Sequence, residues 1–515
     1  MISGAPLNIA NGIREFAIAS PDATAVIDGD RSLTCADVDR RSSQLANAVA
    51  DARMQRGDRI GVLLGNRLEY PEVAAGIAKA GMVMVPVNPR LTSAEAAYIL
   101  SHSSSRALIL DDSLASIAED AVADLDLAAT LSVDGATIGT SYEDAIAGAS
   151  DVDPRVEVDE HDPFCIAYTS GTTGKPKGVL ISHRSRSLTF YASALEWNLG
   201  PGKTTIAVAP MYHGAGFAFA YAAVHTGGTV AMLRAWDPKA LLQMVQDVRP
   251  QSVFLVPAHA HMLRMLGDDA IGGFDTSSLQ TVYFNAAPLP QALKLWFMDT
   301  FAHVECHELY GSTEAGIVSN LRPQDMRRKD ACVGPPWFMT EVRLVDPDGN
   351  VVEGPGEGEL FSRSPYLMNG YLDDPDATAA CTTDDGFLTS GDIARRDEDG
   401  FLYIIDRVKD LIITGGSNVY PREVEEVLAN HDAVAEVAVI GTADEQWGEA
   451  VTACVVLRDG HDLDEAALDA HCRATLAGYK VPKRYEVVAA LPRNAAMKIL
   501  KRELRDQLAT TSHGA

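Results

Sequence analysis

The chemistry in this sequence is most concentrated in a short stretch of glycine, hydroxyl and lysine residues. Residues 170–178 read SGTTGKPKG and lie between two apolar runs, at 164–169 and 179–181. Glycines adopt backbone conformations closed to other residues, so several N–H groups can turn toward one anion. Lys175 and Lys177 add positive charge. The stretch therefore predicts a phosphate-binding loop between two buried strands.

The spacing differs from that of a Walker A loop. That motif has four residues between its glycines and Ser or Thr directly after the lysine. Here two residues separate Gly171 from Gly174, and Pro176 follows Lys175, which disfavours an immediate helix. A flexible Gly/Ser-type linker is the alternative, but linkers seldom lie between two buried strands.

The elements that must position this loop alternate between strands and helices. The helices expected in the first 160 residues are 69–80 and 93–100. The expected strands are residues 59–64, 83–87, 107–110, 206–209, 230–233, 253–256, 281–285 and 304–308. This alternation favours an α/β fold with layered, mostly parallel sheets.

The last third of the chain changes character. Residues 340–405 alternate short segments with Pro/Gly turns, which predicts a small distorted antiparallel barrel. Beyond it we expect helices and strands at 421–430, 436–440, 452–457, 463–476, 485–489 and 498–507. We therefore predict a large domain over residues 1–408 and a smaller, mobile α+β domain over residues 409–515.

Composition excludes several classes of protein. The 515 residues carry 43 Lys and Arg against 71 Asp and Glu, a formal charge of −28 that repels nucleic acid and anionic membranes. No window approaches the roughly 20 apolar residues of a membrane span, and the N-terminus lacks a signal-peptide pattern. The seven cysteines form no CxxC pair, so we expect neither disulfides nor zinc. We expect a cytoplasmic protein with no nucleic-acid partner and no integral membrane contact.

Residues 168–179, YTSGTTGKPKGV, resemble the signature of the adenylate-forming superfamily, which includes acyl-CoA synthetases, peptide-synthetase adenylation domains and luciferases. The resemblance spans roughly residues 15–505 and implies an acyl-CoA-synthetase-like enzyme or an amide synthetase of the marinacarboline type. The further motifs, in the order of the superfamily, are PMYHG at 210–214, NAAPL at 285–289, ELYGSTE at 308–314, TSGD at 389–392, DRVKD at 406–410, GGSNVYP at 415–421 and PRNAAMKI at 492–499.

The resemblance implies a site for ATP and Mg²⁺. It places the Tyr310 ring against adenine, Thr313 near the α-phosphate and Glu314 on the metal, and a carboxylate suits Mg²⁺. Asp392 and Arg407 are the expected ribose contacts. The complete set of expected nucleotide contacts is Thr169, Ser170, Gly171, Thr172, Thr173, Gly174, Lys175, Lys177, Ala286, Ala287, Pro288, Glu308, Leu309, Tyr310, Gly311, Thr313, Asp392, Ile404, Arg407 and Lys498.

The resemblance also implies an acyl pocket. Taken alone, His213 is a structural histidine, but its place between a predicted strand and a glycine-rich turn favours a pocket residue. Small residues here leave room for an aryl or medium-length acyl group. The expected pocket residues are Tyr212, His213, Gly214, Phe217, Asn285, Gly311, Ser312, Gly316 and Ile317.

Four residues receive catalytic roles by resemblance: Thr173, His213, Glu314 and Lys498. Lys498 aligns with the lysine that bridges carboxylate and phosphate, although alone it resembles an ordinary surface lysine. Lys409 is the expected hinge, and Gly415 and Gly416 are expected to act in the second step. Asn285 and Met497 replace glycines that are usual in the superfamily, and Met497 leaves the path of its loop open.

The implied reaction has two steps. A carboxylate attacks the α-phosphorus of ATP and releases pyrophosphate, and the acyl group then passes from AMP to coenzyme A. An amine acceptor, which gives an amide, stays open. A binding protein that no longer reacts and a light-emitting oxidase are the competing classes. His307 and Glu308 form half of a zinc-protease motif, but no second histidine follows at the required spacing.

Overall fold

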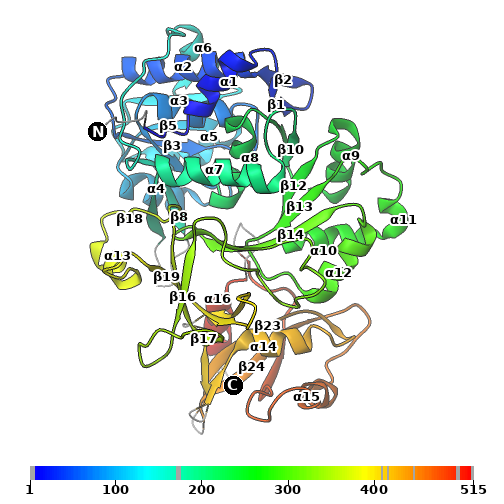
Figure 1. Ribbon diagram of the computed structural model, residues 1–515. Coiled ribbons are helices and arrows are strands. Elements are labelled where there is room, and N and C mark those ends of the chain that lie inside the picture. Colours follow the sequence, from blue (N-terminus) through cyan, green and yellow to red (C-terminus); the bar gives the residue numbers. More distant parts are fainter. Residues whose placement is uncertain are drawn as a thin grey trace. The chain divides into compact units, whose positions relative to one another are not determined.

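The computed structural model of the chain describes residues 6–169, 176–407, 410–414, 417–444, 447–493 and 499–511. The chain divides into two compact units (Figure 1). The first unit comprises Met1–Asp330, Pro336–Glu341 and Ser362–Leu388, and the second comprises Ala331–Pro335, Val342–Phe361 and Thr389–Ala515. A domain boundary between residues 408 and 409 stays a prediction.

The first unit contains a sheet in the order β18-β9-β8-β4-β3-β5-β6-β7. Neighbours from β8 to β7 pair in parallel, whereas β9 pairs antiparallel with both β8 and β18. The strands are β3 (Arg59–Leu63), β4 (Val83–Pro86), β5 (Ser105–Asp111), β6 (Ala129–Val133), β7 (Thr140–Ser141), β8 (Pro163–Thr169), β9 (Lys177–Ser182) and β18 (Gly370–Tyr371).

The second sheet of this unit has the order β15-β14-β13-β12-β10-β11-β1-β2. All neighbours from β14 to β1 pair in parallel, and the edge strands β15 and β2 are antiparallel. The layered, mostly parallel α/β fold is therefore confirmed. The strands are β1 (Thr24–Asp28), β2 (Arg31–Thr34), β10 (Thr204–Ala207), β11 (Thr229–Met232), β12 (Ser252–Leu255), β13 (Thr281–Phe284), β14 (Glu305–Ser312) and β15 (Gly316–Leu321).

Helices of the first unit begin where local sequence favours them. Thr34 and Asp37 form a capping box at α2, and Thr92 and Glu95 form another at α4, so each side chain satisfies a backbone N–H at the helix start. The helices are α1 (Asn11–Ala19), α2 (Cys35–Asp51), α3 (Tyr70–Lys79), α4 (Ser93–His102), the 3₁₀ turn η1 (Asp112–Leu114), α5 (Ala115–Val122), α6 (Tyr142–Ala147), α7 (His183–Trp197), α8 (Gly214–His225), α9 (Pro238–Val248), α10 (Pro257–Leu266), α11 (Asp268–Ile271), α12 (Gln291–Thr300) and α13 (Pro375–Cys381).

One expected strand is displaced. The apolar run at 206–209 predicts a strand there, but β10 ends at Ala207. The backbone N–H of Val208 donates to the carbonyl of Ile206, so the chain turns away from the sheet two residues early. Residues 208–213 then connect β10 to α8, which begins at Gly214.

The second unit contains two further sheets. One, in the region where a small distorted barrel is expected, has the order β16-β17-β19-β20, and its strands β16, β17 and β19 each include residues of the first unit. The other has the order β22-β21-β24-β23, with β25 beside β24. Their elements are β16 (Glu341–Val345), β17 (Gly356–Arg363), β19 (Leu388–Arg396), β20 (Leu402–Arg407), β21 (Ile412–Thr414), β22 (Ser417–Val419), β23 (Val434–Asp444), β24 (Gly448–Leu457), β25 (Arg484–Val487), α14 (Pro421–Leu428), α15 (Glu465–Arg473) and α16 (Lys501–Thr511).

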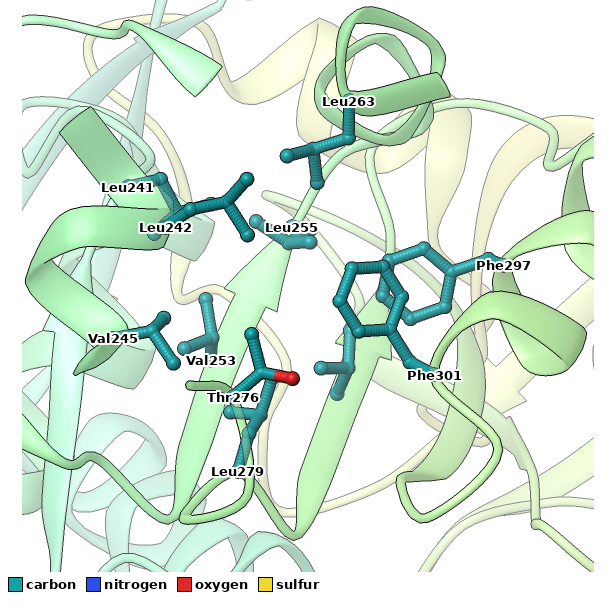
Figure 2. Close-up of a pocket in the computed structure, with 11 residues that line it drawn as sticks. Leu241, Leu242, Val245, Val253, Leu255, Leu263, Thr276, Leu279, Phe297 and Phe301 are labelled. Atoms are coloured by element: carbon teal, nitrogen blue, oxygen red, sulfur yellow. The ribbon is translucent and has the colours of Figure 1, made fainter. Parts of the chain in front are cut away.

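A purely structural pocket lies among α9, α10, α12, β12 and β13 (Figure 2). Leucine, valine and phenylalanine side chains and Thr276 line it, and none of the expected site residues does. Such a wall offers almost no donors to a phosphate or carboxylate, so this gap belongs to the core. No helix among the described residues is long and apolar enough to cross a membrane.

Candidate active site

Three of the sequence motifs come to one edge of the second sheet. Residues 210–213 follow β10, residues 285–288 follow β13, and residues 311–314 lie at the end of β14. These strands are parallel, so their carboxyl ends share an edge, which is where open α/β sheets bind ligands. A Cβ atom added to Gly214 would lie 3.9 Å from Thr313 Oγ1, so the first and third motifs are in contact.

The phosphate loop connects the antiparallel strands β8 and β9. Thr169 and Lys177 are direct cross-strand partners, so the two ends of the loop are held together. Helix α4 supports this base, because the Tyr98 hydroxyl donates to the Pro176 carbonyl at 3.1 Å and the Tyr168 hydroxyl lies 2.8 Å from His102 Nδ1. The expected contacts outside the described residues are Ser170, Gly171, Thr172, Thr173, Gly174 and Lys175.

A chain of side chains links the base of the loop to the expected metal ligand. Lys177 Nζ lies 3.3 Å from Asp374 Oδ2 and 5.0 Å from the centre of the Tyr371 ring. The Tyr371 hydroxyl donates to Glu314 Oε1 at 3.0 Å. Burial, reinforced by the nearby Glu314 carboxylate, raises the pKa of Tyr371, so its hydroxyl remains a donor near neutral pH.

The surroundings of Glu314 suit Mg²⁺. Its backbone carbonyl accepts from Met368 N at 2.8 Å, which holds the turn between β14 and β15. The described part of the chain contains no cluster of three or more His, Cys, Asp or Glu groups that could hold a metal. Mg²⁺ in phosphate-transfer sites is commonly bound by one or two carboxylates plus substrate phosphates and water, and Glu314 fits that pattern.

Strand β14 uses its side chains for packing as well as for the site. The Glu308 carboxylate forms a 2.6 Å ion pair with Lys294 of α12, and both residues are buried. Leu309 belongs to the apolar core. Since both side chains are engaged in the interior, the contacts expected between these two residues and a nucleotide would be made by their backbone atoms. Gly311 needs to be glycine, since a Cβ atom there would lie 2.1 Å from the Gly316 carbonyl oxygen.

The turn after β13 carries backbone strain. Ala286 has φ = 75°, in the left-handed region that glycine prefers, and its N–H donates to Asn285 Oδ1 at 2.6 Å. Ala286, Ala287 and Pro288 are exposed. Asn285, which replaces the usual glycine, thus shapes the turn through its own side chain.

His213 lies at the start of α8 and is almost enclosed. Its Nε2 atom is shielded from solvent and has no hydrogen-bond partner among the described residues. Burial lowers the pKa of His213 to about 4, so its ring is neutral near pH 7. The Tyr212 ring lies 4.8 Å away.

The remaining expected pocket residues divide between surface and core. Ser312 and Gly316 pair across the turn of the β14–β15 hairpin, and the Ser312 hydroxyl accepts from Ala315 N at 3.0 Å. Phe217 and Ile317 are buried in the core. A small pocket is lined by residues of β10, α8, β12 and β13, and neither Phe217 nor Ile317 is among them.

In the second unit, two expected ribose contacts are paired. Asp392 of β19 and Arg407 of β20 are direct antiparallel backbone partners. The Ile404 carbonyl accepts from Arg422 Nη1 at 2.7 Å. The expected residues Lys409, Gly415, Gly416 and Lys498 lie outside the described residues.

The described residues before and after 494–498 are bonded to each other. Arg493 and Ile499 form an isolated antiparallel bridge, and Leu500 N donates to the Pro492 carbonyl at 2.8 Å. Lys501 then begins α16 with a 2.7 Å ion pair to Glu425.

Sequence reasoning missed three residues. Tyr371 reaches Glu314 only because β18 pairs with β9, a contact between positions about 190 residues apart that no local pattern reveals. Lys294 lies on a buried helix face, where a lysine implies a buried partner. Arg186 of α7 shares a helix face with Phe190, Ser193 and Trp197. A charged residue on such an apolar face was the signal in the sequence that could have revealed it.

Comparison with known proteins identifies the class of protein to which the chain belongs. A family model described as "AMP-binding enzyme" matches residues 13–372, and one described as "AMP-binding enzyme C-terminal domain" matches residues 423–498. The chain belongs to this family, and it is an adenylate-forming ligase of the acyl-CoA-synthetase-like branch.

Individual relatives cover nearly the whole chain. It is 37 % identical to a feruloyl-CoA synthase from Amycolatopsis sp, over 94 % of this chain and 96 % of that one. It is 34 % identical to the fatty acid–[acyl-carrier-protein] ligase ScoC from Streptomyces coeruleorubidus, over 95 % of this chain and 94 % of that one. The solved structure of the amide bond synthetase McbA from Marinactinospora thermotolerans superimposes with a TM-score of 0.89 at 30 % identity, covering 97 % of this chain and 99 % of that one.

Proposed function

We propose that this protein activates a small carboxylic acid with ATP to an acyl-adenylate and pyrophosphate, and then transfers the acyl group to coenzyme A. The observation that carries the proposal is the link from Lys177 through Tyr371 to Glu314. It joins the base of a phosphate-binding loop to a carboxylate suited to Mg²⁺. A binding protein without catalysis has no need of this positioned carboxylate.

The first step joins two anions, so its barrier is largely electrostatic and positional. Lys177, Lys175 and Lys498 supply positive charge, and the loop supplies backbone and hydroxyl donors to the phosphates. A Mg²⁺ ion on Glu314 would offset further phosphate charge. Asp392 and Arg407, which are backbone partners in neighbouring strands, are proposed to hold the ribose.

The second step requires a different set of residues. We assign the hinge to Lys409, about which residues 409–515 would turn. That motion would withdraw Lys498 from the carboxylate and bring Gly415 and Gly416 to the acyl-adenylate. The thiol of coenzyme A would then displace AMP.

We propose an aryl or medium-length acid as the substrate. Trp197 stacks between Tyr283 and Trp337, at 5.0 and 5.3 Å, and this buried aromatic cluster packs with Ile317 of the expected pocket. The cluster therefore supports the expected pocket from behind. The 37 % identical feruloyl-CoA synthase supports both an aryl acid and coenzyme A.

An amine acceptor is the second candidate function. The superposition on an amide bond synthetase, with a TM-score of 0.89, favours it. In this version the acyl-adenylate forms in the same way and an amine displaces AMP, which gives an amide.

One experiment tests both versions. The purified protein is incubated with Mg²⁺, ATP and a panel of aryl and aliphatic acids, with coenzyme A and simple amines offered side by side. Pyrophosphate, AMP, light emission and product masses are recorded. We expect acid-dependent pyrophosphate release and an acyl-CoA mass. An amide mass alone would select the second version, and absence of acid-dependent pyrophosphate release would reject both.

A further inference from the structure

Arg186 is a charged residue enclosed by protein without a partner. The described residues give its guanidinium neither a hydrogen bond nor an ion pair, and its Nε atom is shielded from solvent. Burial lowers its pKa to about 10, so it remains cationic near neutral pH. Part of the side chain is nevertheless accessible to water-sized molecules. A buried charge without a counter-charge is strongly destabilising, so a function is needed to explain it.

The surroundings of Arg186 include residues of the expected acyl pocket. Burial raises the pKa of Cys165 in β8 to about 12. The positive charge of Arg186 acts on this pKa in the opposite direction, so the two side chains are neighbours. Phe190, one turn after Arg186 on the same face of α7, has its ring 6.1 Å from that of Phe217, a residue of the expected acyl pocket. The Tyr70 ring lies 6.3 Å from that of Phe217, and its buried hydroxyl has no partner among the described residues.

The position of Arg186 is remote from the phosphate loop. Helix α7 begins at His183, directly after Ser182, and Ser182 pairs with Pro163 at the opposite end of β8 from Thr169, the last described residue before the loop. A group that reaches Arg186 therefore lies at the end of the acid that is far from the reacting carboxylate.

We propose that Arg186 is a specificity-determining residue that binds a second carboxylate, at the far end of the acid substrate. This inference rests on the proposed function. The planar guanidinium can donate two parallel hydrogen bonds to a carboxylate, and the anion supplies the missing counter-charge. The preferred substrate is thus a dicarboxylic acid, of which only one end is activated.

The test compares matched acids with one and two carboxylates. 3-Phenylpropanoic acid is paired with its para-carboxy analogue, and octanoic acid with octanedioic acid. Acid-dependent ATP–pyrophosphate exchange gives kcat/KM for each. The variants are Arg186→Leu and Arg186→Lys. The matched control is Arg184→Leu, which removes an arginine from the same helix whose partner is Glu160 and whose side chain is 40 % exposed.

We expect the native protein to prefer the dicarboxylic acid of each pair. Arg186→Leu should lose about 100-fold in kcat/KM for that acid, mainly through KM, because a buried ion pair to substrate is lost. The monoacid should be affected little or activated faster. Arg186→Lys should keep part of the preference, and Arg184→Leu should keep all of it.

A native protein that does not favour the second carboxylate, or an Arg186→Leu variant that loses activity equally with both acids, overturns the proposal. Should Arg186→Leu fail to fold, the ratio of kcat/KM for the dicarboxylic acid to that for the monoacid, measured in the native protein and in Arg186→Lys, decides the question. If the protein adenylates monoacids, but its kcat/KM for the dicarboxylic acid equals that for the matched monoacid, only the role of Arg186 is rejected. No exchange with any acid rejects the ligase function itself.

Discussion

The hydroxyl of Tyr371 is a single atom on which the expected metal ligand depends. Removing it in Tyr371→Phe leaves the ring beside Lys177 but deletes the 3.0 Å hydrogen bond to Glu314. Groups that orient a metal ligand are worth about 10- to 100-fold in metal affinity or activity. We therefore expect a loss of that size in ATP–pyrophosphate exchange, partly restored by higher Mg²⁺, with steady-state kinetics over a Mg²⁺ series as the measurement.

The control is Tyr403→Phe, which deletes the same atom from a 2.9 Å hydrogen bond to Asp397 in the second unit. It should leave the Mg²⁺ dependence unchanged. Equal effects of the two variants would contradict the role given to Tyr371.

At this scale the sequence predicts residue types better than partners. The loop lysines, His213, Glu314 and Asp392 are recognisable from type and order along the chain. Their contacts are not, because these depend on strand pairing between distant segments. Glu308 illustrates this: its type suits a ligand site, whereas its carboxylate is buried against Lys294.

Among the elements, helix α12 and strand β14 are joined by that buried ion pair. Lys294→Met would leave the Glu308 charge without its partner, which costs about 3–5 kcal/mol in unfolding free energy. Denaturant unfolding, followed by fluorescence, measures the change. The double variant Lys294→Met with Glu308→Gln should regain much of the loss, because no uncompensated charge remains.

The matched control for this pair lies on the surface. Arg327→Met removes the ion pair to Asp299, where the two side chains are 52 % and 69 % exposed. We expect less than about 1 kcal/mol there. A loss in Lys294→Met no larger than in this control would show that the buried pair does not stabilise β14.

Alternation of apolar and polar residues locates most elements within a few residues, as for β3, β4 and α14. It assigns no strand to a sheet, so the presence of two eight-stranded sheets in the first unit could not be predicted. The hairpin β14–β15 was missed for a related reason. The expected strand ends at residue 308, whereas the observed strand continues to Ser312 and the chain returns at Gly316.

At the scale of the whole molecule, burial of histidines predicts sensitivity to acid. Burial lowers the pKa of five histidines to about 4: His183, His213, His225, His259 and His307. In the unfolded chain these groups titrate near 6.5. Between pH 6.5 and 4 the unfolded state therefore binds more protons, so stability is full above pH 6.5 and is lost as the pH falls toward 4.

His259→Asn tests one of these contributions. An asparagine can keep the acceptor for Val256 N, which lies 3.2 Å from His259 Nδ1, but it takes up no proton. The slope of unfolding free energy against pH between 4.5 and 6.5 should fall by about 1.4 kcal/mol per pH unit. His461→Asn, at an exposed position, is the control. A slope that does not change in His259→Asn would contradict the assignment.

The two half-reactions should separate by mutation. Lys498→Ala should slow pyrophosphate release by about 10²–10³-fold, since one preorganised charge is lost from the transition state. Lys409→Pro should impair acyl transfer more than adenylation, because a rigid φ opposes a hinge. Rapid-quench assays of each step, with Arg502→Ala as the surface control, measure both. Unchanged pyrophosphate release in Lys498→Ala, or equal loss of both steps in Lys409→Pro, would contradict these roles.

The pairing of β9 on both sides makes the length of the phosphate loop a critical dimension. Val179 and Leu180 face β8 on one side and Tyr371 and Gly370 on the other. A slip of one residue in β9, which could absorb an insertion or deletion in residues 170–176, would turn its inward side chains outward. It would also shift Tyr371 relative to Glu314. The residue count of this segment is thus constrained by the sheet on both sides of β9, in addition to the demands that phosphate binding makes on its residue types.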